Sequence, residues 1–291
     1  MHWLSKRSTF GWLVIPAAVV YIVFVLYPVG YSVVISLMNY QGFGQPTFAG
    51  LENYHALLAD DLFWVALRNT GIILVAAIFV LIPCSFLLAL LLAGGVRGGG
   101  TARALVFAPH IIAPILVGLV WVFMLDPKLG VLNQILRRLG IENPPSWIGS
   151  AEWSPISSAV VFMWTAIGFL VTIFYAGIRS LPAELLEASQ MDGASRPRQV
   201  WHIVIPLMRS TFMICIVLAI TGALRVFEIV YSMTGGGPVH MSEVLVSYMY
   251  YTAFTQQQYG AGMAMAVVIA IIGAVGSLGY LALARGKERT Q

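Results

Sequence analysis

Residues 71–93 read GIILVAAIFVLIPCSFLLALLLA, without one charged side chain among them. A helix needs about 20 apolar residues to cross the roughly 30 Å hydrocarbon layer of a bilayer, because its backbone N–H and C=O groups must then all be bonded internally. The run is longer than the roughly 10 residues of a membrane-spanning strand, and it does not alternate apolar with polar positions. It therefore predicts a transmembrane helix.

The composition of the whole chain points the same way. Its 291 residues are 59% apolar and only 10% charged, with a mean hydropathy of +0.86, whereas soluble domains carry about 25% charged residues. Two cysteines, Cys84 and Cys215, exclude a disulfide scaffold and a four-cysteine zinc site. The net charge of +4 is too small and too dispersed for nucleic-acid binding. The chain is predicted to be an integral membrane protein.

Six long, charge-poor segments follow the same rule, so we expect an all-α polytopic membrane protein with six transmembrane helices. Lys6 and Arg7 precede the first segment as in a signal peptide, but its apolar stretch is too long, which favours an uncleaved anchor. The six predicted spans are residues 11–37, 71–93, 104–125, 156–178, 208–232 and 261–284.

The distribution of charge predicts the orientation of these spans. With an even number of spans, most of the 16 Lys and Arg residues fall on the side that holds both termini. Because positive residues are retained on the cytoplasmic side, both termini are predicted to be cytoplasmic. The external loops are then residues 38–70, 126–155 and 233–260.

The cytoplasmic connection at residues 179–209 reads RSLPAELLEASQMDGASRPRQVWHIVIPLMR. Pro182 suits a first helical turn, and Glu184 complements the positive end of that helix. Asp192-Gly193 is a turn signal because glycine accepts a positive φ, and Ser195 can begin a second helix. The loop thus predicts two short helices at a sharp corner, which could transmit force to a docked partner or be an ordinary amphipathic loop.

This loop resembles the EAA signature of bacterial ABC-importer permeases of type I. The family pattern is Glu-Ala-Ala, then Gly after three residues, then Ile-x-Leu-Pro after nine more; Ser189 and Ile205 are mild departures from it. Other segments resemble the carbohydrate-importer branch (maltose/glycerol-phosphate-like). These are residues 50–54, 69–70, 130–133, 234–238, 248–254 and 259–260.

The resemblance implies three regions of the chain. They are an N-terminal anchor helix with the first external loop at residues 1–64, the permease domain at 65–285 and a cytoplasmic tail at 286–291. It also implies that the loop at 179–209 forms a coupling helix in a groove of the ATPase subunit. The residues so implied are Glu187, Ala188, Ser189, Asp192, Gly193, Ala194, Ile203 and Pro206.

The resemblance further implies the partners and the location. A permease of this family works in the bacterial inner membrane with an ABC ATPase dimer, a second related permease subunit and an external solute-binding protein. This chain would bind no cofactor or nucleic acid, because ATP and Mg belong to the ATPase. The sequence agrees, because the one Gly-Lys pair, Gly286-Lys287, is not part of a P-loop. Leu281 occupies the position of the first glycine of that motif, and Glu288 occupies the position of its Ser or Thr. The five histidines lack metal-ligand spacing, and the sequence contains no G-x-S-x-G, H-E-x-x-H or C-x-x-C motif, so no enzymatic activity is expected of the chain.

Ionisable residues inside a membrane segment are candidates for a substrate pathway. In the fifth predicted span, Thr221, Arg225, Glu228 and Ser232 are spaced to form one polar stripe on a helix. The stripe could hydrogen-bond to the hydroxyl groups of a sugar. Alternatively, Arg225 and Glu228 pair with each other or with a partner subunit and extend outward, or they serve an ion-coupled secondary transporter or channel.

The fourth predicted span carries a second candidate face. Phe162, Thr165, Ala166 and Phe169 recur at helical spacing, and aromatic rings can stack on sugar rings while Thr165 donates a hydrogen bond. The other interpretation of this stripe is packing between helices. His110, between Pro109 and Pro114, is expected to be a buried histidine with its hydrogen bonds satisfied.

Overall fold

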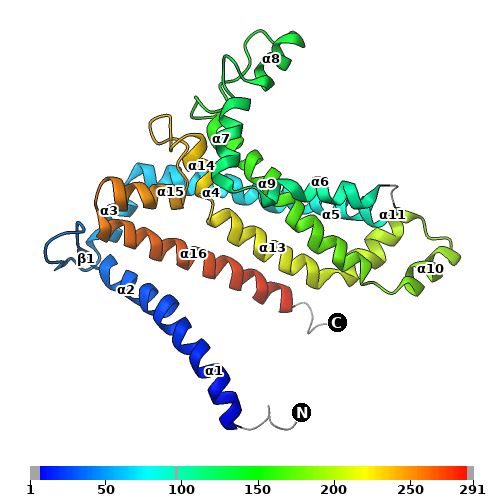
Figure 1. The fold of residues 1–291 in the computed structure, drawn as a ribbon, viewed down its shortest axis with the longest axis horizontal. Coiled ribbons are helices and arrows are strands. Elements are labelled where there is room, and N and C mark those ends of the chain that lie inside the picture. The colour runs from blue at the N-terminus through cyan, green and yellow to red at the C-terminus, as the bar shows by residue number, and fades with distance from the viewer. Residues whose placement is uncertain (1–6, 96–97, 287–291) are drawn as a thin grey trace. The chain divides into compact units, whose positions relative to one another are not determined.

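The computed structural model describes residues 7–95 and 98–286, most of which are helical (Figure 1). The chain divides into two compact units, Met1–Asp61 with Met249–Ala270, and Leu62–Tyr248 with Ile271–Gln291. Lys6 and nearly all of the predicted tail at 286–291 lie outside the described residues.

The first unit combines one long helical segment with a small hairpin. Its two short strands pair antiparallel, with Met38 opposite Phe48 and Asn39 opposite Thr47. The elements are α1 (Arg7–Tyr21), the π-helical segment η1 (Ile22–Leu26), α2 (Tyr27–Ser36), β1 (Met38–Asn39), β2 (Thr47–Phe48), α3 (Glu52–Leu58), the π-helical segment η4 (Tyr251–Thr255) and the first part of α16 (Tyr259–Gly286).

The second unit contains the remaining helices, the second part of α16 and an extensive apolar core. Its elements are α4 (Asp61–Ala76), the π-helical segment η2 (Ala77–Leu81), α5 (Ile82–Ala93), α6 (Gly99–Ile111), α7 (Pro114–Met124), α8 (Val131–Arg138), α9 (Trp153–Arg179), α10 (Ala183–Met191), α11 (Arg196–Gln199), the π-helical segment η3 (Val200–Val204), α12 (Ile205–Leu207), α13 (Arg209–Leu224), α14 (Glu228–Met233) and α15 (Leu245–Tyr250).

Three of the π-helical segments end two residues before a proline: Pro28, Pro83 and Pro206. A proline ring clashes with the carbonyl group four residues earlier and provides no N–H for the helical ladder. A wider turn just before it accommodates both effects without ending the helix. The structure thus explains how these apolar segments continue through a proline.

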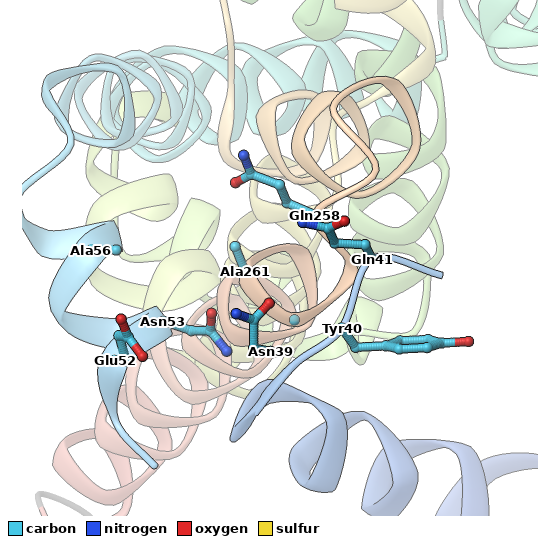
Figure 2. Close-up of a pocket in the computed structure, with 9 residues that line it drawn as sticks. Asn39, Tyr40, Gln41, Glu52, Asn53, Ala56, Gln258 and Ala261 are labelled. Atoms are coloured by element: carbon cyan, nitrogen blue, oxygen red, sulfur yellow. The ribbon is translucent and has the colours of Figure 1, made fainter. Parts of the chain in front are cut away.

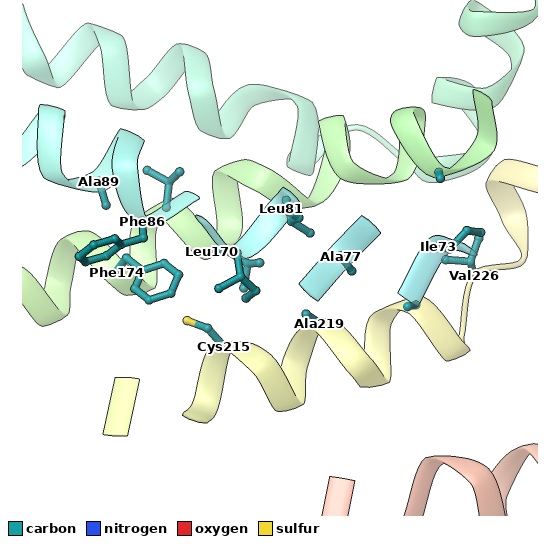
Figure 3. Close-up of a cluster of buried hydrophobic side chains, with 14 of the residues drawn as sticks. Ile73, Ala77, Leu81, Phe86, Ala89, Leu170, Phe174, Cys215, Ala219 and Val226 are labelled. Atoms are coloured by element: carbon teal, nitrogen blue, oxygen red, sulfur yellow. The ribbon is translucent and has the colours of Figure 1, made fainter. Parts of the chain in front are cut away.

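The core of the second unit lies where α4–η2–α5, α9 and α13 meet (Figure 3). Ala77 and Ala89 are fully buried there, and their small side chains allow the helices to approach closely. Phe86, Phe174 and Phe212 form an aromatic cluster with ring centroids 4.8–5.6 Å apart. This packed core holds α9 and α13 in place, and both helices contribute to the candidate sites described below.

Four helices are long and apolar enough to cross a membrane: Val14–Ser36, Asp61–Ala93, Trp153–Arg179 and Tyr259–Ala282. They correspond to four of the predicted spans, although the second begins ten residues earlier than expected, at Asp61 rather than Gly71. Two bent helix pairs also qualify if each is taken as one span, so the described residues provide four to six spans.

The third predicted span, residues 104–125, is wrong as a continuous helix. It consists of Gly99–Ile111 and Pro114–Met124, which meet at an angle of 97°. The reason is local: a residue before proline is disfavoured in the helical region, and Ala113, just before Pro114, has φ −57° and ψ 128°.

The fifth predicted span, residues 208–232, is also interrupted. α13 ends at Leu224, the backbone leaves the helical path at Arg225–Phe227, and α14 begins at Glu228. The side chain of Val226 at the break is buried in the core, while Arg225 and Glu228 beside it are exposed. The single helical stripe of Thr221, Arg225, Glu228 and Ser232 is therefore wrong, because no continuous helix carries it.

Candidate coupling loop and translocation site

The loop after α9 forms two helices with a sharp corner between them, as the sequence predicts (Figure 1). Pro182 precedes α10 instead of lying within it, and Glu184 is in the first turn of that helix. At the other end of α10, Gly193 has φ +78°, a conformation that costs glycine little and other residues more. Its N–H bonds the Gln190 carbonyl at 3.0 Å.

The next N–H, of Ala194, bonds the Ser189 carbonyl at 3.0 Å. Together with the Gly193 bond it forms the Schellman arrangement that ends many helices. Ser195 then occupies the N-cap position of α11, with Pro197 at its second residue. Local chemistry thus accounts for the corner.

A buried polar contact that sequence reasoning missed joins the two helices. The Gln199 side-chain amide donates a hydrogen bond of 2.9 Å to the hydroxyl oxygen of Ser189 and one of 3.3 Å to the Leu186 carbonyl. The Ser189 hydroxyl in turn donates to the Leu186 carbonyl at 2.8 Å. Both Ser189 and Gln199 are buried. The sequence held one signal for this contact: Ser189 stands where the family pattern has alanine, and a hydroxyl group at that position needs a polar partner such as Gln199.

The eight predicted coupling residues separate into two groups. Ser189 is buried and Ala194 and Ile203 are partly buried, so these three support the corner. The other five are exposed: Glu187, Ala188, Asp192, Gly193 and Pro206. Apolar side chains accompany them at the surface, since Met191 is 89% exposed. The loop presents a mixed acidic and apolar face on a corner that buried hydrogen bonds hold together.

The candidate substrate-path residues gather only in part. A cavity of about 200 Å³ lies beside both helix breaks of the second unit. α9 contributes Phe162, Thr165 and Ala166, and the break between α13 and α14 contributes Arg225 and Glu228. No ion pair joins Arg225 to Glu228 within the described parts of the chain. The cavity thus brings together five of the eight candidates.

The other three candidates do not line this cavity. Thr221 is exposed and its hydroxyl donates to the Val217 carbonyl at 2.7 Å, while the Ser232 hydroxyl donates to the Glu228 carbonyl at 2.7 Å. Phe169 lies beside the cavity, half-exposed. The Thr165 hydroxyl was expected to donate a hydrogen bond to a sugar, but it donates to the Phe162 carbonyl at 2.8 Å instead. It can still accept a hydrogen bond.

His110 is exposed, so the expectation that it is buried is wrong. It lies near the end of α6, just before the break that turns the chain towards α7, and it lines the same cavity. Its Nδ1 lies 3.2 Å from the Thr165 carbonyl oxygen, and its ring stacks on Phe169 with centroids 5.0 Å apart. The histidine thus adds a flat ring and a polar edge to the site.

In residues 7–95 and 98–286, no group of three or more His, Cys, Asp or Glu side chains could hold a metal ion. The arrangement supplies instead two features: a hydrogen-bonded corner with an exposed face, and a cavity where helices are interrupted. Neither shows the geometry of a nucleophile with its base.

Residues 101–289 match the family described as binding-protein-dependent transport system inner membrane component. The chain therefore belongs to this family, and it is the multi-pass, membrane-spanning permease component of an ABC transporter. Neither the family nor its relatives support an ion-coupled carrier or channel.

The chain is 32% identical over 273 residues to the probable ABC transporter permease protein YurN of Bacillus subtilis, covering 92% of this chain and 94% of YurN. It is 33% identical to the sn-glycerol-3-phosphate transport system permease protein UgpA of Agrobacterium fabrum, covering 89% of each chain. The fold resembles a chain in the crystal structure of a bacterial ABC transporter that imports alginate, with a TM-score of 0.83, 22% identity and coverage of 97% and 96%.

Proposed function

We propose that this permease passes a sugar or sugar-like solute, such as a di- or oligosaccharide or a glycerol-phosphate ester, from an external binding protein into the cytoplasm. Relatives support this class of substrate: UgpA is named for sn-glycerol-3-phosphate, and NgcF of Streptomyces coelicolor, 32% identical, for diacetylchitobiose uptake. The proposal takes each bent helix pair as one span, so that six spans place both termini in the cytoplasm.

The observation that carries the proposal is the cavity at the two helix breaks. Interrupted membrane helices leave backbone and polar groups available where they line a passage. The ring of Phe162 offers an apolar face for a sugar ring, while Arg225 and Glu228 offer charge-assisted hydrogen bonds to hydroxyl groups. We assign these residues, with Thr165, Ala166 and His110, to the substrate path, and Phe169 to its border.

The corner between α10 and α11 is the proposed contact with the ATPase. Glu187, Asp192 and Met191 form an exposed face, and the buried Ser189–Gln199 bond stiffens the corner behind it. Closure of an ATPase dimer on ATP would push this corner as one body and open the cavity outward. ATP and Mg are used by that partner, and the chain itself binds no cofactor and performs no covalent chemistry.

Six helices from one chain form only part of a pathway, so a second, related permease subunit completes it. The solved alginate importer supports an external partner, since one of its structures is a complex with a pentasaccharide-bound periplasmic protein.

The test is transport by the reconstituted complex. The chain is purified in mild detergent with its native partners, which are identified by mass spectrometry, and the assembly is placed in liposomes. We expect ATP-dependent uptake of a labelled carbohydrate that requires the binding protein. Uptake by this chain alone, driven by an ion gradient without ATP, would contradict the proposal.

A further inference from the structure

A second cavity lies within the first unit, far from both proposed sites in the sequence. Its volume is about 250 Å³. Three segments form it: residues 39–41 after α2, the start of α3, and residues 258–261 at the start of α16 (Figure 2). Under the proposed topology these segments lie on the outer side of the membrane, where no function has been assigned to them.

The walls of this cavity are held by hydrogen bonds that use the Asn53 amide and backbone groups but not the side chains of Asn39, Gln41 and Gln258. The Asn53 amide donates to the carbonyls of Ser36 and Met38 at 2.8 and 2.9 Å, which ties α3 to the start of the hairpin. The Gly260 N–H donates to the Tyr40 carbonyl at 3.0 Å, which ties α16 to the same hairpin. A Cβ at Gly260 would overlap the Met38 carbonyl, so the approach is close. The cavity is therefore pre-formed.

The side chains around the space are polar, and three of the four amides among them are available to a ligand. Figure 2 shows the amides of Asn39 and Asn53 near each other, with Gln41 and Gln258 on another side of the space. Within the described ranges, the side chains of Asn39, Gln41 and Gln258 make no hydrogen bond. An amide offers both donors and acceptors, and so does each hydroxyl group of a sugar.

The charge of the lining decides between kinds of ligand. Glu52 is its one charged residue among the described ones, and no Lys, Arg or His faces the space. A phosphate or carboxylate ligand would therefore meet no cation, and a metal ion would find a single carboxylate where Ca²⁺ takes 6–8 oxygen ligands. The lining fits a neutral polyhydroxyl compound.

The size of the cavity limits the size of the ligand that it can hold. Pockets for drug-sized ligands measure about 300–1,000 Å³, so a space of about 250 Å³ suits one sugar ring better than a chain of them. We propose that this cavity, lined by Asn39, Gln41, Asn53 and Gln258, is an outer binding site for a single ring of a neutral saccharide. The inference rests on the proposed sugar transport and on the proposed orientation of the chain in the membrane.

The test measures protection of a cysteine placed in the cavity. Ala56 lines the space and is exposed, so Ala56→Cys is introduced with the exposed Cys84 replaced by Ser. The full chain in nanodiscs, without binding protein, is alkylated with a maleimide in maltose, N,N′-diacetylchitobiose, glucose or glycerol 3-phosphate. We expect at least one neutral sugar to slow alkylation severalfold and glycerol 3-phosphate to have no effect.

Two variants locate the effect. Asn39→Ala with Gln258→Ala should abolish protection, because both amides are lost without breaking a hydrogen bond that holds the walls. Glu52→Gln should retain it, because the site is proposed for a neutral ligand. The matched control is Arg138→Cys, an exposed position on α8 whose alkylation no sugar should slow.

Several results would overturn the proposal. One is the absence of protection by every neutral sugar, and another is protection that persists in the double variant. Protection by sugar-free binding protein alone would assign the cavity to a protein contact. Protection by calcium chloride that is lost in Glu52→Gln would assign it to a cation. ATP-dependent sugar uptake by the complex is measured in parallel. If no sugar protects the cysteine but uptake is normal, the outer binding site is disproved and the proposed transport function is not.

Discussion

Gln199 donates a buried hydrogen bond of 2.9 Å to the hydroxyl of Ser189, across the corner where α10 turns into α11. The same Ser189 provides the carbonyl that receives the Ala194 N–H at the end of α10. One residue thus joins the turn to the second helix. In the proposed contact with the ATPase, this connection would keep the corner from bending when the partner subunit moves.

Gln199→Ala should weaken coupling without removing the protein from the membrane. The substitution deletes the donor and leaves polar groups of Ser189 and Leu186 without this partner, at a local cost of about 1–3 kcal/mol. We expect binding-protein-stimulated ATPase activity of the complex to fall severalfold. The control is Gln190→Ala, the same chemical change at an exposed position of α10. Equal activity of the two variants would show that the buried bond has no part in coupling.

Gly193→Asp should leave the chain inserted and abolish docking of the ATPase. A side chain at φ +78° is strained by roughly 1–2 kcal/mol, and the added carboxylate changes the charge of the exposed corner. Co-purification of the ATPase measures the effect. Gly140→Asp is the matched control, because Gly140 also has a positive φ and open surroundings but lies outside the coupling loop. Normal co-purification and uptake by Gly193→Asp would contradict the role of the corner.

Glu228→Gln should raise the KM for uptake and leave assembly unchanged. The amide keeps the shape of the side chain but loses charge-assisted hydrogen bonds, which contribute about 1.5–3 kcal/mol each. We therefore expect a KM increase of about tenfold or more in the liposome assay. Glu142→Gln, at an exposed residue of the loop after α8, should leave the uptake curve unchanged. An unchanged curve for Glu228→Gln would remove this carboxylate from the path.

His110→Ala and His110→Phe should have different effects on transport. Phenylalanine retains a ring to stack on Phe169, whereas alanine removes it; such ring pairs contribute about 0.5–1.5 kcal/mol. We expect KM to rise about two- to tenfold for the alanine variant and less for phenylalanine. If both variants lose transport equally, the bond to the Thr165 carbonyl is what matters; if neither changes KM, His110 has no role in the path.

The membrane helices and the corner between α10 and α11 could be predicted from the sequence because their causes are local. Hydrophobic length alone identifies Val14–Ser36 and Trp153–Arg179 as helices that can cross a membrane. The Asp192-Gly193 pair alone indicates a turn. The first helix break also has a local cause, because Pro114 disfavours a helical backbone at Ala113. The prediction of one span over residues 104–125 did not take this proline into account.

The second break had no such signal. Residues 208–232 are apolar enough for one helix, and they are interrupted at Arg225–Phe227, where Val226 is buried in a core formed by distant segments. That break removes the expected polar stripe, yet it brings Arg225 and Glu228 to a cavity shared with His110 of α6. The periodicity of one segment could not predict that α6 and the break between α13 and α14 line the same cavity.

The sequence by itself determined that the chain resembles a membrane permease and that residues 179–209 turn a sharp corner, because apolar length, glycine at a turn and the spacing of the EAA signature are properties of neighbouring residues. Only the tertiary structure decided which side chains share the cavity, and that Ser189 is clamped by Gln199. Those contacts depend on how separate helices pack: Val226 is buried by segments far along the chain, and the Ser189 hydroxyl is bonded by Gln199 of the following helix.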